Sequence, residues 1–113
     1  MILRAAVCAM LLAVPASAAC RIPMPPPKYA GPTWYDPTIR ILPYWDVDAA
    51  CLSMGVPHLY FGERFDACAP APYMILSRVG VAGITLEDQR CEFFHERGHL
   101  AGWPANHPGE VFQ

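Results

Sequence analysis

Apolar and β-branched residues in the middle of the chain form short runs that are separated by turn residues. Their length and composition are typical of strands, and the last run (PYMILSRVGV) is the clearest of them. We expect strands at 38–44, 58–61, 64–68 and 72–81. Between the first two, residues 46–54 predict a short helix that is capped by Asp46 or Asp48 and ends at Gly55.

The spacing of apolar residues changes to a helical period in the last third of the chain. Thr85, followed three residues later by Asp88, is typical of a capping box, and apolar side chains recur at helical spacing from there to Ala101. Gly102 suits a helix C-terminus, and Pro104 cannot continue a helix. We therefore expect a helix of ordinary length between Thr85 and Gly102.

These elements predict one α+β domain. A small, mostly antiparallel sheet would pack against the C-terminal helix, with the other short helix behind it. Apolar residues make up 54% of the chain, which favours a folded domain over a disordered segment. The formal net charge of −2 provides no basic footprint, so we expect no nucleic-acid partner.

Residues 1–19 have the pattern of a secretory signal peptide. Arg4 provides a positive start, residues 5–14 form an apolar run, and Pro15-Ala16-Ser17-Ala18 supplies the small residues that signal peptidase reads. The run is too short to anchor the chain across a bilayer. We expect export of the protein, to the periplasm or the exterior.

The four cysteines that follow the signal peptide bear on compartment and anchoring. An even number in an exported chain predicts two disulfides, and among the three pairings we favour Cys51 with Cys68, which would tie a helix to the following strand. Ser17-Ala18-Ala19-Cys20 is also similar to a bacterial lipobox, although Ser17 stands where Leu is usual. We expect membrane attachment only if Cys20 is lipidated.

Proline is concentrated in the segment that follows the signal peptide. Six prolines in residues 20–37 exclude a helix or a central strand, so this segment predicts an extended linker or a strap along the domain surface. Residues 38–113 would form the domain itself.

The chemistry of the chain is concentrated in His95-Glu96-Arg97-Gly98-His99, within the predicted C-terminal helix. Residues four apart lie on one face of a helix, so the imidazoles of His95 and His99 can bind one Zn²⁺ ion. Glu96 can hold a metal-bound water, take its proton and pass it to a leaving amine. The spacing is therefore what amide hydrolysis requires.

Two acidic residues precede this motif on the same predicted helix. Asp88 and Glu92 lie roughly two turns and one turn before His95. Either could orient a ligand imidazole, or both could form a solvated acidic face near the helix N-terminus. His58, in a predicted strand or loop, is either an oxyanion donor or a structural histidine.

The segment HERGHLAGWPANHP resembles the zincin metallopeptidase motif in its extended H-E-x-x-H-x-x-G form. It resembles most closely small, uncharacterised bacterial exported proteins that carry H-E-x-x-H-x-x-G-W-x-x-x-H-P. That resemblance implies a minimal zincin-like domain with Zn²⁺ bound by His95, His99 and His107, and with Glu96 as the general base. The spacing departs from metzincins, because His107 comes five residues after Gly102 and no Met-turn follows, so Glu110 is the alternative third ligand.

These observations predict a zinc-dependent metallopeptidase-like hydrolase that acts on a peptide or protein substrate, such as one of the cell envelope. An extended substrate would pair with an edge strand, for which we expect residues 72–79. The alternative is a non-catalytic zinc-binding structural or interaction module, in which a fourth protein ligand such as Glu110 would close the site.

Overall fold

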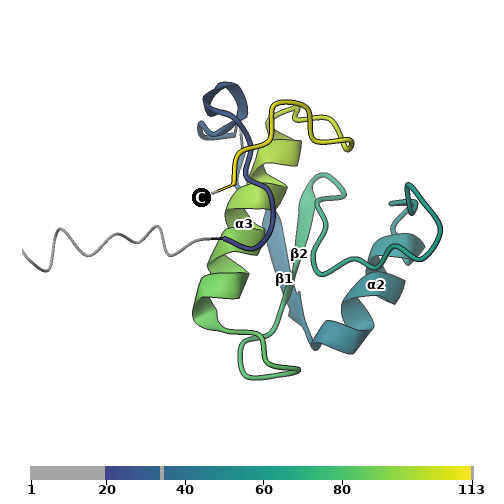
Figure 1. Cartoon of the computed structure of the whole chain (residues 1–113). Coiled ribbons are helices and arrows are strands. Elements are labelled where there is room, and N and C mark those ends of the chain that lie inside the picture. Colours follow the sequence, from purple (N-terminus) through teal and green to yellow (C-terminus); the bar gives the residue numbers. More distant parts are fainter. Residues whose placement is uncertain (1–19, 34, 113) are drawn as a thin grey trace, which may run out of the picture.

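The protein is an α+β domain in which a small sheet lies between two helices (Figure 1). The computed structural model describes residues 20–33 and 35–112, so the predicted signal peptide lies outside the described residues. The elements in chain order are the 3₁₀ turn η1 (Pro27–Tyr29), β1 (Thr38–Leu42), α2 (Tyr44–Ser53), β2 (Tyr73–Ser77) and α3 (Leu86–Leu100). Helices α2 and α3 both contact β2.

The two strands of the sheet are parallel, so the prediction of a mostly antiparallel sheet is wrong. Thr38 pairs with Tyr73 and Leu42 with Ser77, in register along their whole length. Helix α2 and a long loop carry the chain from the end of β1 back to the level where β1 began. A parallel pair requires such a crossover, whereas a tight hairpin would have given an antiparallel pair.

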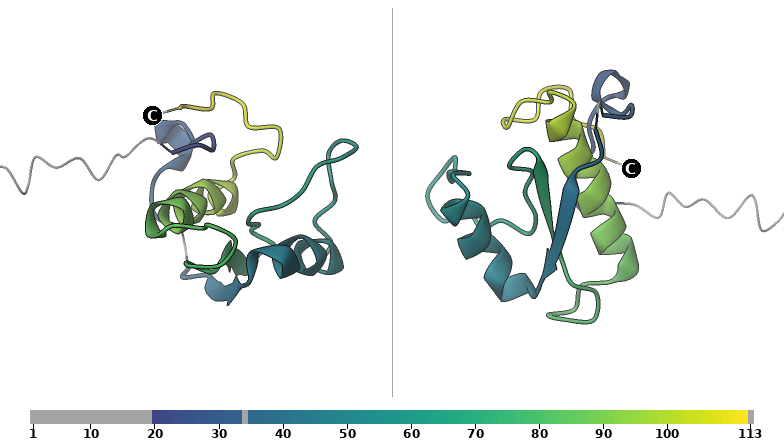
Figure 2. Two further views of the ribbon diagram at one scale, coloured as in Figure 1. Left: turned by 60° about the horizontal axis from the view of Figure 1, so that its bottom comes forward. Right: turned by 180° about the vertical axis from the view of Figure 1, so that it is seen from behind.

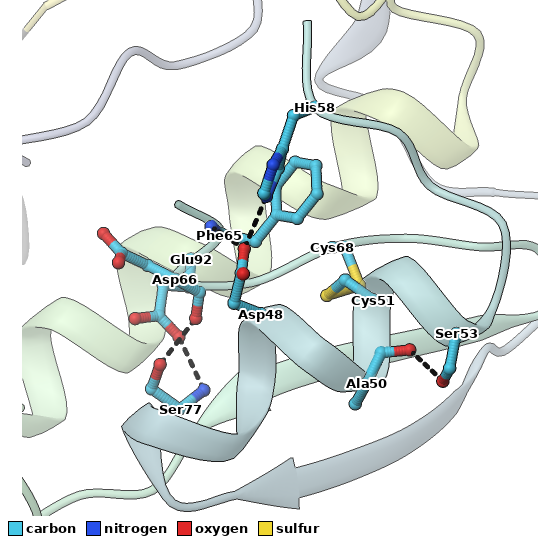
Figure 3. Close-up of a disulfide and its surroundings, with 10 residues drawn as sticks. All are labelled: Asp48, Ala50, Cys51, Ser53, His58, Phe65, Asp66, Cys68, Ser77 and Glu92. Carbon is cyan, nitrogen blue, oxygen red and sulfur yellow. Dashed lines mark hydrogen bonds and ion pairs between the residues drawn. A yellow bond between two sulfur atoms is a disulfide. The ribbon is translucent and has the colours of Figure 1, made fainter. Parts of the chain in front are cut away.

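Two predicted strands before β2 do not form. Residues 58–61 lie in an irregular loop with bends and a turn, and residues 64–68 contribute one antiparallel bridge, between Cys68 and Ile75. The side chain of Asp48, expected to cap α2, instead accepts hydrogen bonds in this loop from the Phe65 N–H (2.9 Å) and from Nε2 of His58 (2.8 Å), as Figure 3 shows. Helix α2 begins after Pro43 with no side-chain cap.

Helix α3 begins and ends as its sequence predicts. The Thr85 hydroxyl accepts from the Asp88 N–H and the Asp88 carboxylate accepts from the Thr85 N–H, which completes a capping box. At the other end, the N–H groups of Gly102 and Trp103 donate to the carbonyls of His99 and Gly98. This is a Schellman ending, and it requires the left-handed backbone of Gly102 (φ 104°).

Two disulfides staple the domain. Cys51–Cys68 joins α2 to the segment before β2 (Figure 3), which confirms the predicted pair. It lies in the core with Val47 and Ile75. Cys20–Cys91 joins the N-terminal segment to α3. Two disulfides are typical of proteins from an oxidising, extracytoplasmic compartment. Among the described residues, no helix has the length and apolar character needed to cross a membrane.

The N-terminal residues run along α3 and meet the C-terminal loop. Met24 forms an antiparallel bridge with Val111, with N–H···O distances of 2.7 and 2.9 Å. Figure 2 shows the N-terminal and C-terminal segments side by side at the end of α3 where the helix stops. We call residues 20–26 the N-terminal strap.

Candidate metal centre

Three histidines converge where α3 ends. His95 and His99 stand one turn apart on the helix, and His107 comes from the loop that follows it. The Nε2 atom of His99 lies 3.2 Å from Nε2 of His95 and 3.1 Å from Nε2 of His107. One nitrogen from each ring therefore falls within a group no wider than 4.8 Å. The structure brings together the three histidines that the sequence singled out.

The opposite nitrogens of His95 and His99 are held by backbone carbonyls. Nδ1 of His95 lies 2.5 Å from the Pro23 oxygen, and Nδ1 of His99 lies 2.8 Å from the Trp103 oxygen. A carbonyl only accepts, so each Nδ1 carries the ring proton and donates it. The two Nε2 atoms then present lone pairs toward each other, which suits a shared cation and not a mutual hydrogen bond.

The ending of α3 places the oxygen that holds His99. The Schellman turn at Gly102 brings the Trp103 backbone back against the last turn of the helix. The Trp103 indole is buried, stacks on the His99 ring (4.9 Å between centroids, 18° between planes) and donates from Nε1 to the Pro108 oxygen (2.9 Å). Trp103 thus fixes both His99 and the residue that follows His107.

Glu110, the alternative third ligand, does not join the three histidines. Its carboxylate lies 3.9 Å from Nδ1 of His107, the nitrogen that does not face the other two rings. It can support that ring from behind, as carboxylates commonly do for metal-binding histidines. Among residues 20–33 and 35–112, no fourth His, Cys, Asp or Glu belongs to the group.

A cleft of about 490 Å³ opens beside the histidines. All three line it, together with Glu92 and Glu96 from α3 and the loop segment 63–69 on the facing wall. Glu96 is only 6% exposed, so its carboxyl group is largely enclosed where it borders this cleft. The expected general base and the expected metal ligands therefore share one cavity.

Burial changes the protonation of these groups. Desolvation lowers the pKa of His95 to about 4, against the opposing effect of its bond to Pro23, and burial also lowers the pKa of His99 and His107. Neutral imidazoles bind metal, so the ligands are ready at neutral pH. Burial, with the neighbouring Glu92, raises the pKa of Glu96 to about 8, and this value applies to the protein without a cation.

Glu92, Asp88 and His58 do not have the roles that the sequence suggested for them. Glu92 is buried and accepts a hydrogen bond from the Ser77 N–H (2.9 Å), as Figure 3 shows. Asp88 is used in the capping box. Neither residue therefore orients a ligand imidazole, and Glu92 is not part of a solvated face. His58 pairs with Asp48 and does not line the cleft.

The outer edge of β2 is not free to bind an extended chain, which corrects the expected position of a substrate. The Ile75 backbone is paired with Cys68, the Ser77 N–H with Glu92, and the Ser77 carbonyl with the Gln89 side chain. An unpaired backbone edge is found instead in the segment 67–69, on the side of that segment that faces away from β2. Ala67 and Ala69 line the cleft, and their backbones enter none of the backbone hydrogen bonds among the described residues.

The residues that orient His95 and His99 were not identified in the sequence. Both act through backbone oxygens, which every residue has, so no residue type marks them. The one available signal was the proximity of Trp103 to a helix ending at Gly102, because a Schellman turn folds the chain back on the helix.

Comparison of the chain with protein-family models, with curated proteins and with solved structures found no match. The chemical assignment therefore rests on the donor set. Three neutral imidazoles are a ligand set that Zn²⁺ favours, and the residues present fit that ion.

Proposed function

We propose that this protein is an exported zinc-dependent hydrolase of the zincin type that cleaves peptide bonds, with His95, His99 and His107 as ligands. The observation that carries the proposal is the shared cleft: three converging Nε2 atoms and the enclosed carboxyl group of Glu96 border one cavity. Buried, perturbed groups that meet in a cleft are typical of catalytic sites.

Zinc, when bound, supplies Lewis acidity that makes water a nucleophile near neutral pH. Burial, with the neighbouring Glu92, raises the pKa of Glu96 to about 8, and the positive charge of a bound zinc ion would favour its ionised form. The ionised Glu96 takes a proton from the attacking water as the oxygen adds to the peptide carbonyl carbon. It then delivers that proton to the amine nitrogen as the C–N bond breaks. The carbonyls of Pro23 and Trp103 keep the ligand rings in the tautomer that this chemistry needs.

The wall opposite Glu96 suits an extended peptide. The N–H and C=O groups of Ala67 and Ala69 face away from β2, because the intervening Cys68 is paired with Ile75. A substrate strand would pair there by main-chain hydrogen bonds, within the cleft that Ala67 and Ala69 line together with the histidines.

The second candidate is a non-catalytic zinc-binding module of the cell envelope. The metal centre joins the N-terminal strap, α3 and the C-terminal loop, and small domains commonly use such staples. A structural zinc site is closed by a fourth protein ligand, whereas a catalytic site keeps an open position. The three-member ligand group favours the catalytic assignment.

Replacement of Glu96 by Gln tests the proposal. We expect Glu96→Gln to keep stoichiometric zinc, because Glu96 is not a ligand, and to lose cleavage of a mixed peptide library by at least about 100-fold, because the proton transfer is gone. Zinc is measured by elemental mass spectrometry and cleavage by peptide mass spectrometry. Glu87→Gln, at the exposed start of the same helix, is the matched control.

Three outcomes separate the candidates. Undiminished cleavage by Glu96→Gln would remove Glu96 as the base, and loss of zinc from that variant would make it a ligand. Stoichiometric zinc in the wild type without cleavage of any peptide would favour the structural module.

A further inference from the structure

The N-terminal strap follows the face of α3 that carries the metal centre. Its contacts advance along the helix in order: Cys20 is bonded to Cys91, Pro23 contacts His95, and Pro25 packs on Gly98. A Cβ atom on Gly98 would lie 2.7 Å from the Pro25 ring, so the helix and the strap are in direct contact. The strap is therefore part of the site and not a separate linker.

The strap supplies the acceptor that orients His95. The Pro23 carbonyl oxygen accepts a hydrogen bond from Nδ1–H of His95, with an N···O distance of 2.5 Å, although the two residues are 72 positions apart in the chain. Without it, the imidazole is free to turn or to change tautomer, and Nε2 would lose its direction toward His99. Loss of such an outer partner typically weakens metal binding about 10- to 100-fold.

The disulfide holds that oxygen in place. Cys91 lies one helical turn before His95, and Cys20 lies three residues before Pro23, so the cross-link sits directly beside the contact. Further along, two backbone hydrogen bonds pair Met24 of the strap with Val111. Those bonds lead to the C-terminal loop, which itself carries His107.

We propose that formation of the Cys20–Cys91 disulfide completes the metal centre, with Pro23 as a positioning residue for the zinc ligand His95. In this step two thiols lose two protons and two electrons to a disulfide oxidant, which leaves as two thiols. High-affinity zinc binding is then confined to the oxidised chain. This inference rests on the proposed zinc binding by the three histidines.

The disulfide and lipidation compete for one atom. Lipidation of Cys20 would use its sulfur in a thioether, and the structure places that sulfur in the bond to Cys91. A chain lipidated at Cys20 would therefore carry the low-affinity form of the site.

The first test compares oxidised wild type with Cys20→Ser/Cys91→Ser, in which Cys51–Cys68 remains. We expect zinc affinity, measured by competition with a chromophoric chelator, to fall about 10- to 100-fold in the variant. Imidazole ¹⁵N NMR of the zinc-free proteins should show His95 losing its fixed Nδ1–H tautomer. His99 should keep its tautomer in both proteins, because its partner is the Trp103 oxygen.

A second measurement needs no variant. Binding linkage is reciprocal, so if the disulfide strengthens zinc binding, zinc must oppose reduction of the disulfide by the same factor. In glutathione buffers with and without buffered zinc, peptide mapping should show Cys20–Cys91 about 10- to 100-fold harder to reduce when zinc is present. Cys51–Cys68, in the same sample, should respond far less.

Equal zinc affinity in the variant and the wild type, or a reduction equilibrium of Cys20–Cys91 that zinc leaves unchanged, would overturn the inference. A wild-type protein that binds no zinc even when oxidised would instead overturn the proposed function.

Discussion

His107 adopts a left-handed backbone conformation, with φ of 58°, in the loop after α3. Residues other than glycine rarely occupy this region, and where they do the conformation is often tied to function. Here it turns the imidazole back toward the helix, and its Nε2 reaches 3.1 Å from that of His99. This turn brings the third histidine to the site five residues after Gly102.

Removal of each candidate third ligand distinguishes their roles. We expect His107→Ala to weaken zinc binding by more than about 100-fold, beyond the usual effect of an outer partner. Glu110→Ala should change it by less than about tenfold, because its partly exposed carboxylate faces the far side of the His107 ring. Chelator competition measures both. A greater loss in Glu110→Ala than in His107→Ala would exchange the two assignments.

At the scale of elements, α3 is positioned by its two ends and by the strap along its face. The capping box determines where the helix starts, and the Schellman turn determines where the chain reverses to deliver Trp103 and His107. Gly98 is the point where this helix accepts the strap. A glycine inside a helix costs about 1 kcal/mol relative to alanine, and the close approach of Pro25 explains why it is present.

Gly98→Ala should therefore lower stability despite the better helix propensity of alanine. The added methyl group would lie 2.7 Å from the Pro25 ring and 3.1 Å from Cε3 of Trp103, and overpacking of this kind costs about 1–3 kcal/mol. Urea unfolding measures the change. Gly31→Ala is the control, because a Cβ at Gly31 meets nothing within 4 Å. A more stable Gly98→Ala protein would contradict the described contact.

At the scale of the whole molecule, α3 is joined to the sheet through a buried carboxyl group. Glu92 is 3% exposed and accepts from the Ser77 N–H, and burial raises its pKa to about 7. A raised carboxyl pKa means that the folded state binds more protons than the unfolded state between pH 4.5 and 7. The contribution of Glu92 to stability is therefore present below pH 4.5 and is lost as the pH rises through 7.

Glu92→Gln should remove this pH dependence, since glutamine can accept the same hydrogen bond and does not titrate. We expect the unfolding free energy of the variant, relative to the wild type, to rise by on the order of 1 kcal/mol per pH unit between pH 5 and 7. Urea unfolding of the zinc-free proteins measures it, with Glu87→Gln as the exposed control. A difference that stays constant with pH would show that Glu92 titrates normally.

The sheet shows where sequence patterns were insufficient. Strand composition identified β1 and β2, but the prediction of antiparallel pairing was wrong, although the intervening helix 46–54 was itself predicted. The residue types of a short strand do not indicate whether its partner strand runs parallel or antiparallel to it. The helix between them was the available signal, because a crossover connection joins parallel strands.

The sequence by itself determined the features that depend on near neighbours: the limits of α3, its capping box, its glycine ending and the one-face spacing of His95 and His99. Local hydrogen bonds and helical periodicity control these features, and both depend directly on which residue types occur at neighbouring positions. Tertiary structure decided the arrival of His107 at the site, the enclosure of Glu92 and Glu96, and the use of the Pro23 oxygen by His95. Those features arise where segments distant in the chain come together. They depend on burial and on contacts with backbone atoms, and residue type does not specify either.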